Sequence, residues 1–369
     1  MNLGYDAKRA FLNTSGLGNY SRNTLNALQK YYPQHEYTLF TPDLKIGMLK
    51  QQDAFKVIFP SKSMSKLKKT WWRNYQVSKE VAKQKVDLFH GLSNELPRGI
   101  HKTSIPSVVT IHDLIFLRYP EFYKPIDRKI YYQKVKYASN AATKIIAISE
   151  QTKLDIVSFY GIHPAKIEVI HQSISPLFFD KADTVSVQEK YQLPDHFVLA
   201  VGTVEERKNQ LTVIKALQAK EIDLPLVLVG NPTSYCNDIH KYLAEYNIKD
   251  KVLFLKNIPE KDLAAIYQLA ELSVYISVFE GFGLPVIEAM ACGCPVITSN
   301  VSCLPETAGK AAILCSPEKE EEIGNSIYNI LNNDKLRQGL VQKGIDRARE
   351  FSAQNYAARL MNLYNGIIG

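Results

Sequence analysis

The segment SVFEGFGLPVIEAMACGCPVITS, residues 277–299, predicts a strand, a glycine loop, a helix and a second strand in direct succession. Gly281 and Gly283 allow the backbone of the loop to approach a ligand closely, because glycine has no side chain. The dipeptide Leu284-Pro285 is typical of a helix start, since proline is tolerated at the first helical position. The free N–H groups of that helix would face whatever the loop binds, and they favour an anion.

Two carboxylates belong to this segment: Glu280 precedes the glycine loop, and Glu288 lies within the expected helix. A carboxylate beside an anion site indicates that the ligand carries a further polar group, such as a sugar. The pair and its surroundings, EGFGLP followed by EAMACGCPVITS, resemble the donor-site signature of retaining GT-B glycosyltransferases, in particular family 4. The resemblance extends over nearly the whole chain and implies a nucleoside diphosphate sugar as the donor.

The composition is that of an ordinary globular protein. With 369 residues, 46% of them apolar and 22% charged, the chain is long enough for two domains. No apolar run approaches the roughly 18 residues that a membrane span requires. The first residues lack the apolar core of a signal peptide, and the five cysteines lack metal-binding spacing, so we expect a cytoplasmic protein with structural thiols.

Strand-like and helix-like segments alternate along both halves of the chain, which favours parallel sheets covered by helices. In the first half we expect strands at residues 2–6, 37–41, 56–59, 86–91, 107–112, 144–148 and 166–171, and helices at 20–31 and 128–142. In the second half we expect strands at 197–202, 224–230, 252–255 and 272–277, and helices at 209–219, 238–246, 259–269, 318–332, 334–350 and 353–367.

The best-fitting architecture for this α/β pattern is GT-B, two doubly wound Rossmann-like domains that face each other across a cleft. The polar stretch 172–196, broken by Pro176 and Pro194, is interpreted as the interdomain connection. We therefore expect an N-terminal acceptor-side domain over residues 1–175 and a C-terminal donor-binding domain over 176–352. The resemblance implies that the last helix, 353–369, packs back on the first domain.

The net charge of +8 is concentrated between Lys56 and Lys85, where nine basic residues stand against one acid, Glu80. The basic residues are Lys56, Lys62, Lys66, Lys68, Lys69, Arg73, Lys79, Lys83 and Lys85. Met64, Leu67, Trp71 and Tyr75 recur there at helical spacing. The segment is either a basic amphipathic helix on an anionic membrane or a helix packed on its own domain with a solvated lysine face. No nucleic-acid motif accompanies the charge, so no nucleic-acid partner is expected.

A glycine-rich turn at residues 14–19 separates the first expected strand from the first helix. Such turns form a usual ligand edge of a parallel sheet, although the glycines do not match the dinucleotide fingerprint. The family resemblance implies that Gly16 and Gly18 contact the donor phosphates, and that Asn19 lies on the acceptor side. The alternative is a tight turn that needs glycine for its backbone conformation alone.

His112 and Asp113 follow a buried strand, at the edge of the sheet that faces the ligand crevice in open α/β folds. A lone histidine is usually structural, but the resemblance implies that His112 contacts the transferred sugar. Asp113 is interpreted as a residue that orients the loop. His90, at the end of the preceding strand, and Asn94 are further acceptor-side candidates.

Arg207 and Lys208 open the second domain within the sequence GTVEERKN. They resemble the basic pair that holds the donor diphosphate in family 4, where fixed cations stabilise the charge that develops on the leaving group. Many family members have an arginine directly after the glycine, and this chain has Thr203 there. That difference places more of the phosphate charge on Arg207.

The resemblance assigns Glu280 to the sugar and the catalytic charge, and Glu288 to the ribose hydroxyls. The loop amides of Phe282, Gly283 and Leu284 would hold sugar hydroxyls and phosphate. A glycosidase also uses a carboxylate pair, but the glycine loop and the basic partners favour a nucleotide. The segment 302–306, SCLPE, resembles one that braces this site, which makes Glu306 structural.

The resemblance implies a retaining transfer of a hexose from a nucleoside diphosphate sugar to an acceptor hydroxyl. The resemblance indicates bacterial surface polysaccharide or glycolipid assembly, with mannose as a candidate sugar and a saccharide or lipid-linked saccharide as acceptor. Peripheral contact with the inner membrane face would follow from residues 56–85. No Asp-x-Asp motif occurs, so we expect activity without a metal or other cofactor. The alternatives are a non-catalytic nucleotide-sugar-binding protein and a sugar-nucleotide epimerase.

Overall fold

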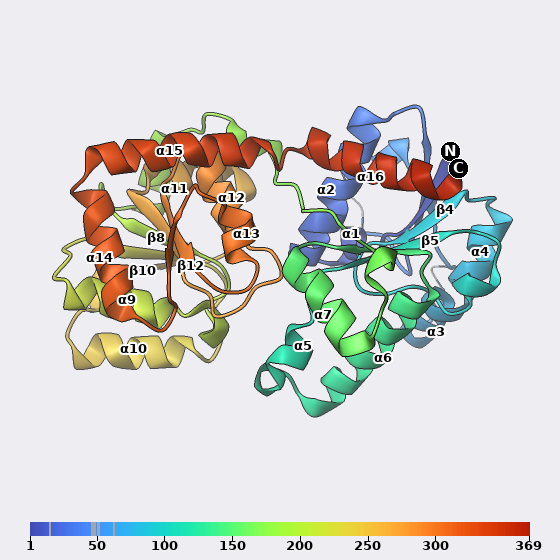
Figure 1. The fold of residues 1–369 in the computed structure, drawn as a ribbon, viewed down its shortest axis with the longest axis horizontal. Helices are drawn as coiled ribbons and strands as arrows, with labels where there is room; N and C mark the ends of the chain where they lie inside the picture. Colours follow the sequence, from blue (N-terminus) through green and yellow to red (C-terminus); the bar gives the residue numbers. More distant parts are fainter. Residues whose placement is uncertain (15, 46–48, 50–51, 62) are drawn as a thin grey trace. The chain divides into compact units, whose positions relative to one another are not determined.

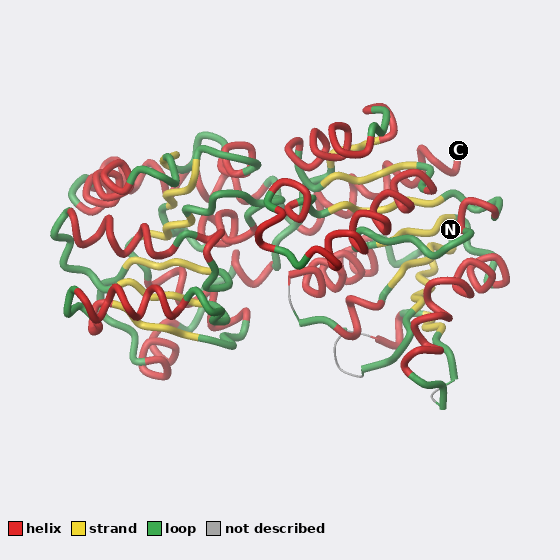
Figure 2. The backbone as a smooth tube through the Cα atoms, turned by 90° about the horizontal axis from the view of Figure 1, so that it is seen from below, coloured by secondary structure: helices red, strands yellow, loops and turns green. Residues whose placement is uncertain are grey.

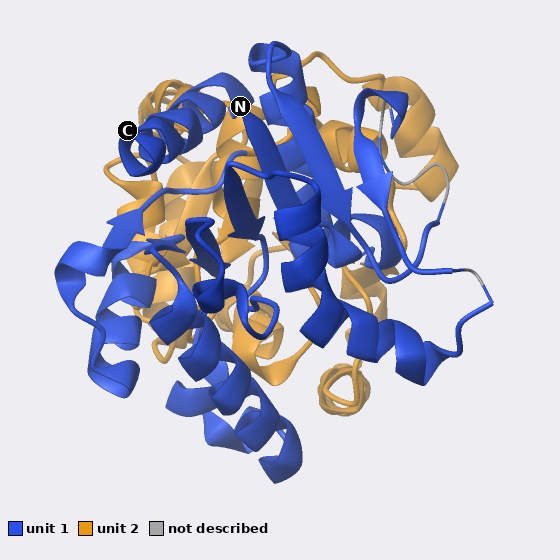
Figure 3. Cartoon of the chain, turned by 90° about the vertical axis from the view of Figure 1, so that its right-hand side faces the viewer, with its two compact units in different colours: residues 1–173, 353–369 blue, residues 174–352 orange. Residues whose placement is uncertain are grey.

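The computed structural model describes residues 1–14, 16–45, 49, 52–61 and 63–369, so Ser15 of the expected turn and Lys62 of the basic segment lie outside the described residues. The chain divides into two compact units, coloured separately in Figure 3. Unit 1 comprises residues 1–173 and 353–369, and unit 2 comprises residues 174–352. The border follows Ser173, whereas the sequence predicts it after residue 175.

A parallel sheet runs through unit 1 (Figure 1), and its described strands have the order β3-β2-β1-β4-β5-β6-β7. The strands are β1 (Asn2–Asp6), β2 (Glu36–Phe40), β3 (Lys56–Ile58), β4 (Leu88–Gly91), β5 (Ser107–Ile111), β6 (Lys144–Ala147) and β7 (Ile167–Val169). The helices are α1 (Lys8–Leu12), α2 (Gly16–Tyr31), α3 (Lys66–Trp71), α4 (Val77–Lys83), α5 (Ile115–Arg118), α6 (Pro125–Ala141), α7 (Glu150–Tyr160) and α16 (Ala353–Ile368).

Unit 2 has a second parallel sheet, with the strand order β10-β9-β8-β11-β12-β13. Its strands are β8 (Val198–Val201), β9 (Leu226–Val229), β10 (Val252–Leu255), β11 (Leu272–Tyr275), β12 (Val296–Ser299) and β13 (Ile313–Cys315). Its helices are α8 (Thr184–Tyr191), α9 (Gln210–Ala219), α10 (Cys236–Glu245), α11 (Glu260–Leu269), α12 (Leu284–Ala291), α13 (Leu304–Ala308), α14 (Glu320–Leu331) and α15 (Asp334–Arg349).

Helices cover both faces of each sheet, as Figure 2 shows by the red helices on either side of the yellow strands. This arrangement explains why central strands are buried along their whole length. The four residues of β9, Leu-Val-Leu-Val, are all buried, as are the five residues of β5. A strand with one face in water would alternate apolar and polar residues instead.

Each sheet reverses its strand order at one point, between β1 and β4 in unit 1 and between β8 and β11 in unit 2. The connections on the two sides of such a point run in opposite directions. In open α/β sheets, ligands bind at the carboxyl ends of the two strands beside such a point. The loops after β8 and β11 carry Arg207, Lys208 and Glu280.

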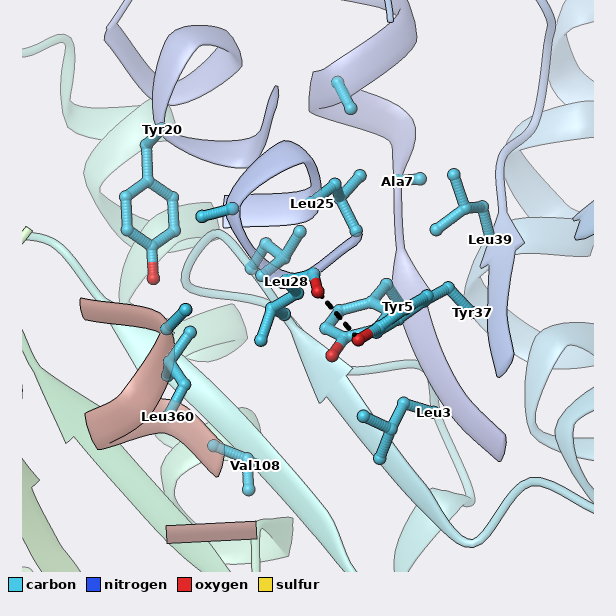
Figure 4. Close-up of a cluster of buried hydrophobic side chains, with 14 of the residues drawn as sticks. Leu3, Tyr5, Ala7, Tyr20, Leu25, Leu28, Tyr37, Leu39, Val108 and Leu360 are labelled. Atoms are coloured by element: carbon cyan, nitrogen blue, oxygen red, sulfur yellow. Dashed lines mark hydrogen bonds between the residues drawn. The ribbon is translucent and has the colours of Figure 1, made fainter. Parts of the chain in front are cut away.

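The C-terminal helix α16 is part of unit 1, although 179 residues of unit 2 precede it. Its Leu360 belongs to the same buried cluster as Leu28 of α2 and Val108 of β5 (Figure 4). Two tyrosine hydroxyls of α16 add polar contacts to this cluster. The hydroxyl of Tyr356 donates a hydrogen bond to that of Tyr20 at 2.7 Å, and the hydroxyl of Tyr364 lies 2.6 Å from Nδ1 of His90.

The structure differs from the sequence prediction at residues 14–19, because Gly16, Gly18 and Asn19 lie in the first turn of α2 and not in a turn before it. The chain packs tightly there. A Cβ atom at Gly18 would lie 1.9 Å from the carbonyl oxygen of Asn13, which ends α1. The backbone of α2 therefore begins against α1, and glycine is required for that close approach.

The predicted connection over residues 172–196 is also more ordered than expected. It contains α8, whose N-terminus is capped by the side chain of Asp183, which accepts a hydrogen bond from the backbone N–H of Ser186. Val187 on this helix is buried in unit 2. Among the described residues, no helix is both long and apolar enough to cross a membrane.

Candidate functional site

The loops after β8 and β11 run side by side at the carboxyl edge of the unit 2 sheet. The backbone N–H of Val278 donates a hydrogen bond of 2.9 Å to the carbonyl of Arg207. The guanidinium of Arg207 donates in return to the carbonyl of Phe279 at 2.7 Å. The two loops are adjacent because β8 and β11 are hydrogen-bonded neighbours, although 72 residues separate Arg207 from Phe279.

Arg207, Lys208 and Glu280 form one ion cluster at this edge. Oε1 of Glu280 lies 2.8 Å from a guanidinium nitrogen of Arg207 and 2.5 Å from Nζ of Lys208. The three side chains are 16%, 12% and 9% exposed, so water screens the cluster weakly. Lys208 also donates to the hydroxyl of Tyr275, and its ammonium lies 4.7 Å from the centre of that ring.

The electrostatics of the cluster keep Glu280 ionised. Burial alone would raise the pKa of this carboxyl, but Lys208 and Arg207 beside it outweigh burial and lower its pKa to about 2. Burial lowers the pKa of Lys208, and Glu280 partly opposes that effect. Arg207 also pairs with Glu205, at 2.5 Å. The cluster therefore holds two cations and two carboxylates in direct contact.

The glycine loop between β11 and α12 is held in place from α13 and the residues just before it. Ser302 accepts a hydrogen bond from the backbone N–H of Glu280 at 3.1 Å. The thiol of Cys303 donates to the carbonyl of Glu280, and the hydroxyl of Thr307 donates to the carbonyl of Phe282 at 2.5 Å. The segment 302–306 therefore braces the loop through Ser302 and Cys303.

Gly283 is the N-cap of α12 and has a positive φ of 94°. A Cβ atom there would lie 2.5 Å from a methyl carbon of Leu304, so both backbone strain and space exclude a side chain. Leu284 and Pro285 start the helix, as the sequence predicts. The ring of Phe282 is buried and lies 5.6 Å from that of Phe351, which leaves only its backbone for a ligand.

Glu288 lies in the second turn of α12 and has an environment separate from that of Glu280. Its carboxylate accepts a hydrogen bond of 3.3 Å from the hydroxyl of Tyr267 on α11. Burial, with a smaller contribution from the charge of Glu260, raises the pKa of Glu288 to about 8. The two glutamates of the motif therefore differ in charge at neutral pH, Glu280 ionised and Glu288 protonated.

In unit 1 the structure brings His112 together with Asn94 at the carboxyl edge of the sheet. The side-chain oxygen of Asn94 accepts a hydrogen bond of 2.8 Å from the backbone N–H of His112, and Nε2 of His112 lies 2.9 Å from the carbonyl of Leu92. A carbonyl can only accept, so Nε2 carries the proton and Nδ1 is an acceptor. Burial lowers the pKa of His112 to about 4, which keeps the ring neutral.

His90, expected on the acceptor side, lies in the interior of unit 1. His90 is fully buried, and its two ring nitrogens contact the hydroxyls of Tyr364 and Thr110 at 2.6 and 2.8 Å. It therefore joins β4, β5 and α16 in the core. Asn19 is exposed on α2, and its side-chain oxygen accepts a hydrogen bond from Arg22 at 2.5 Å. Gly16 is exposed, and a Cβ atom there would meet nothing within 4 Å.

A hollow of about 190 Å³ opens beside Asn94 in unit 1. Its lining combines charged groups, among them Arg9 and Glu95, with the ring of Tyr131. Asp113, the residue after His112, also lines it. Among the residues that the structure describes, no group of three or more His, Cys, Asp or Glu side chains is placed to hold a metal ion.

Comparison with known proteins decides the family. The family described as Glycosyltransferase Family 4 matches residues 14–176, and that described as Glycosyl transferases group 1 matches residues 183–347. O-antigen chain mannosyltransferase B of Escherichia coli is 31% identical over 286 residues, which are 75% of this chain and 74% of that protein. The chain belongs to glycosyltransferase family 4.

Further relatives and solved structures agree with this placement. O-antigen chain mannosyltransferase RfbU of Salmonella typhimurium is 30% identical to this family 4 glycosyltransferase over 60% of each chain. Sucrose-phosphate synthase of Thermosynechococcus elongatus matches 100% of this chain and 99% of its own at a TM-score of 0.79 and 21% identity. The Anabaena protein HepE, solved with UDP, matches 99% of this chain and 100% of its own at 0.77 and 16% identity. These structures show that the fold is GT-B.

The sequence of this family 4 glycosyltransferase did not reveal three residues of the site. Tyr275 ends β11 and contacts Lys208, Glu205 pairs with Arg207, and the ring of Tyr20 stands edge-on against His112 at 4.5 Å. Only Tyr275 carried a usable signal, because it lies at the carboxyl end of a strand beside the switch point. The other two depend on which loops and helices are neighbours.

Proposed function

We propose that this protein is a retaining hexosyltransferase. It transfers a hexose, with mannose as the first candidate, from a nucleoside diphosphate sugar to a hydroxyl of a saccharide or lipid-linked saccharide. The names of the relatives from E. coli and S. typhimurium support mannose and surface polysaccharide assembly. The HepE structures with UDP and UDP-glucose support a nucleotide-sugar donor, although at 16% identity they share only the fold.

The observation that carries the proposal is the contact of Glu280 with Arg207 and Lys208 at the switch point of unit 2. Arg207 and Lys208 are the cations that would hold the donor diphosphate, and Glu280 would take up the sugar hydroxyls. Glu280 contacts both cations. The diphosphate replaces part of this contact, which releases a carboxylate oxygen for the sugar and for positive charge at the anomeric carbon.

In the proposed reaction the bond between the anomeric carbon and the diphosphate oxygen breaks. The acceptor oxygen bonds to the same face of that carbon, and the hydroxyl proton passes to the leaving diphosphate oxygen. Arg207 and Lys208 stabilise the charge on the leaving group. His112 is neutral, and its Nδ1 accepts a hydrogen bond from a sugar hydroxyl. Glu288, protonated near neutral pH, can both donate to and accept from the ribose hydroxyls.

The central test compares Glu280→Gln with Glu288→Ala. Glu280→Gln should lower transfer by about 100-fold or more while nucleoside diphosphate binding is kept, because the interaction acts on the transition state. Glu288→Ala removes both the hydrogen-bond donor and the acceptor, so it should weaken nucleotide binding, measured by calorimetry, more than it lowers turnover of the bound donor. Normal turnover by Glu280→Gln would remove the proposal.

Product analysis separates the two alternatives. An epimerase would change the configuration of the donor sugar without any acceptor present. A non-catalytic binding protein would bind the donor and neither hydrolyse nor transfer it. Retention of configuration is read from the anomeric coupling constant of the product in an NMR spectrum.

A further inference from the structure

An exposed apolar stripe lies along α3 and along the helical turn that comes after it. Leu67, Trp71 and Tyr75 are 82%, 54% and 53% exposed and lie four residues apart, so they share one helix face. The rings of Trp71 and Tyr75 stack at 6.4 Å. Large apolar side chains exposed as a group, and not singly, indicate an interaction surface.

The opposite face of the same helical segment fixes how this stripe is presented. A π-helical turn, Trp72–Gln76, follows α3, and Trp72 and Arg73 at its start are buried. The guanidinium of Arg73 lies 2.5 Å from Asp6 and 2.6 Å from Glu95. The segment therefore cannot roll to hide its apolar stripe without breaking buried ion pairs.

Helix α6 carries a second stripe of the same kind. Ile126 and Ile130, one turn apart, are 69% and 45% exposed. Lys134 and Tyr137 continue that face toward the C-terminal end of the helix. The charge of residues 56–85 gives no indication of this second stripe, because α6 lies outside that segment.

The C-terminal end of the first stripe adjoins the C-terminal half of α6. Tyr75 and the α6 residues Lys134 and Tyr137 line one hollow of about 120 Å³. Glu95 joins the helices, since one of its oxygens pairs with Arg73 and the other with Lys134 at 3.1 Å. We call the exposed residues Leu67, Trp71, Tyr75, Ile126 and Ile130 the α3–α6 face.

Basic side chains border the α3–α6 face. Exposed Lys66 and Lys68 flank Leu67, and exposed Lys129 precedes Ile130. Arg98 lies over the ring of Tyr137 at 4.1 Å, at the rim of the hollow. Helix α6 contains four basic residues and one acid, Asp127. An apolar and aromatic strip with a basic border is complementary to a layer of anionic headgroups above an acyl region.

We propose that the α3–α6 face docks this protein on an anionic membrane. The aromatic and aliphatic side chains enter the headgroup boundary, and the lysines remain at the level of the lipid phosphates. Not every basic residue of the segment 56–85 takes part in this docking. Lys69 is paired with Asp43 at 2.9 Å, and Arg73 is buried in ion pairs with its own unit. The docking does not depend on the proposed transfer reaction and can be measured without donor or acceptor.

The first test is sedimentation of the protein with two kinds of vesicle, phosphatidylcholine alone and phosphatidylcholine with about 30% phosphatidylglycerol. Binding should require the anionic lipid and weaken with salt. Two double variants, Leu67→Ser/Trp71→Ser and Ile126→Ser/Ile130→Ser, should each lower the vesicle affinity about tenfold or more. Each variant removes two apolar side chains that would be buried in the lipid. These residues are exposed, so the variants should unfold at the wild-type temperature.

Matched controls come from unit 2, where Val185 and Tyr328 are 68% and 53% exposed. Val185→Ser and Tyr328→Ser should bind the anionic vesicles like the wild type. Equal losses in these controls, or equal binding of the wild type to both vesicles, would overturn the proposal. Binding of the two α3–α6 double variants to anionic vesicles at the wild-type level would also overturn the proposal.

The chain also contains its own probe, because Trp71 and Trp72 are its two tryptophans. Trp72 is 8% exposed, so a Trp72→Phe variant reports through exposed Trp71 alone. Its emission should shift to shorter wavelength with anionic vesicles and stay unchanged with neutral ones. A blue shift that appears without lipid as the protein concentration rises would show that a second copy covers this face, and would count against the membrane.

Discussion

Nζ of Lys208 lies 2.5 Å from Oε1 of Glu280, although 72 residues separate them in the chain. Each residue lies in a different loop, and the two loops meet because β8 and β11 are neighbours at the point where the strand order reverses. Burial would favour the neutral forms of both groups, and their contact keeps the carboxylate ionised, with a pKa of about 2. The proposed donor site therefore contains an ionised carboxylate in direct contact with two basic side chains.

Replacing Lys208 by methionine should impair both stability and turnover. Lys208→Met keeps the volume of the side chain but leaves buried Glu280 with Arg207 as its remaining cation. Breaking a buried ion pair typically costs about 3–5 kcal/mol, and loss of one charge-stabilising group lowers the rate constant by about 100-fold or more. Denaturant unfolding and steady-state kinetics measure the two effects.

Lys215→Met is the matched control for this change. Lys215 is 36% exposed on α9 and pairs with Glu320 at 3.4 Å. An exposed pair of this kind contributes about 0–1 kcal/mol, so stability and turnover should stay near the wild-type values. If Lys208→Met behaved like Lys215→Met, the ion cluster would have no part in catalysis.

Glu288 should make stability depend on pH in a defined window. Its pKa is raised from 4.5 to about 8 in the folded protein, whereas the unfolded chain ionises near 4.5. As the pH rises from 4.5 to 8, the unfolded state releases a proton that the folded state retains, so the wild type loses stability. Above pH 8 both states are ionised and the loss stops growing.

Glu288→Gln removes this titration, so it should gain stability relative to the wild type across that window. Thermal unfolding of both proteins from pH 4.5 to above pH 8 measures the difference. The gain should be small at the acidic end and level off at the alkaline end. A difference that shrinks with rising pH would show that Glu288 is ionised and stabilised by a cation instead.

Transfer should not require a divalent metal. Arg207, Lys208 and the N-terminus of α12 are the groups that we propose to neutralise the diphosphate. Turnover in excess chelator should therefore equal turnover in added magnesium. Activity that is lost in chelator and restored by magnesium would place a metal on the diphosphate and reduce the role of the basic pair.

The hydroxyl of Tyr364 should stabilise unit 1 through His90. Tyr364→Phe leaves Nδ1 of a fully buried histidine without this partner, which typically costs about 1–3 kcal/mol. Tyr328→Phe, at an exposed tyrosine of α14, should change stability by less than about 0.5 kcal/mol. Equal unfolding free energies for the two variants would show that the contact of Tyr364 with His90 does not stabilise unit 1.

Much of the fold follows from short-range sequence patterns. Apolar runs of four or five residues alternate with helix-length segments, and this periodicity is enough to predict most strands and the parallel arrangement. The start of α12 was predictable as well, since Leu284 and Pro285 carry a local helix-start signal. The start of α2 was not, because Gly16 and Gly18 have the same turn signal whether or not Asn13 of α1 packs against them.

The sequence by itself determined the family, the two α/β halves and the candidate residues Glu280, Arg207 and Lys208. Each of these depends on patterns within short stretches of consecutive residues. Only the tertiary structure decided which candidates touch. It joined Lys208 to Glu280, buried His90 beneath α16 and placed Tyr75 beside Lys134 and Tyr137 of α6. Such contacts depend on strand order and on which face a helix turns inward, and neither is encoded in the spacing of any single segment.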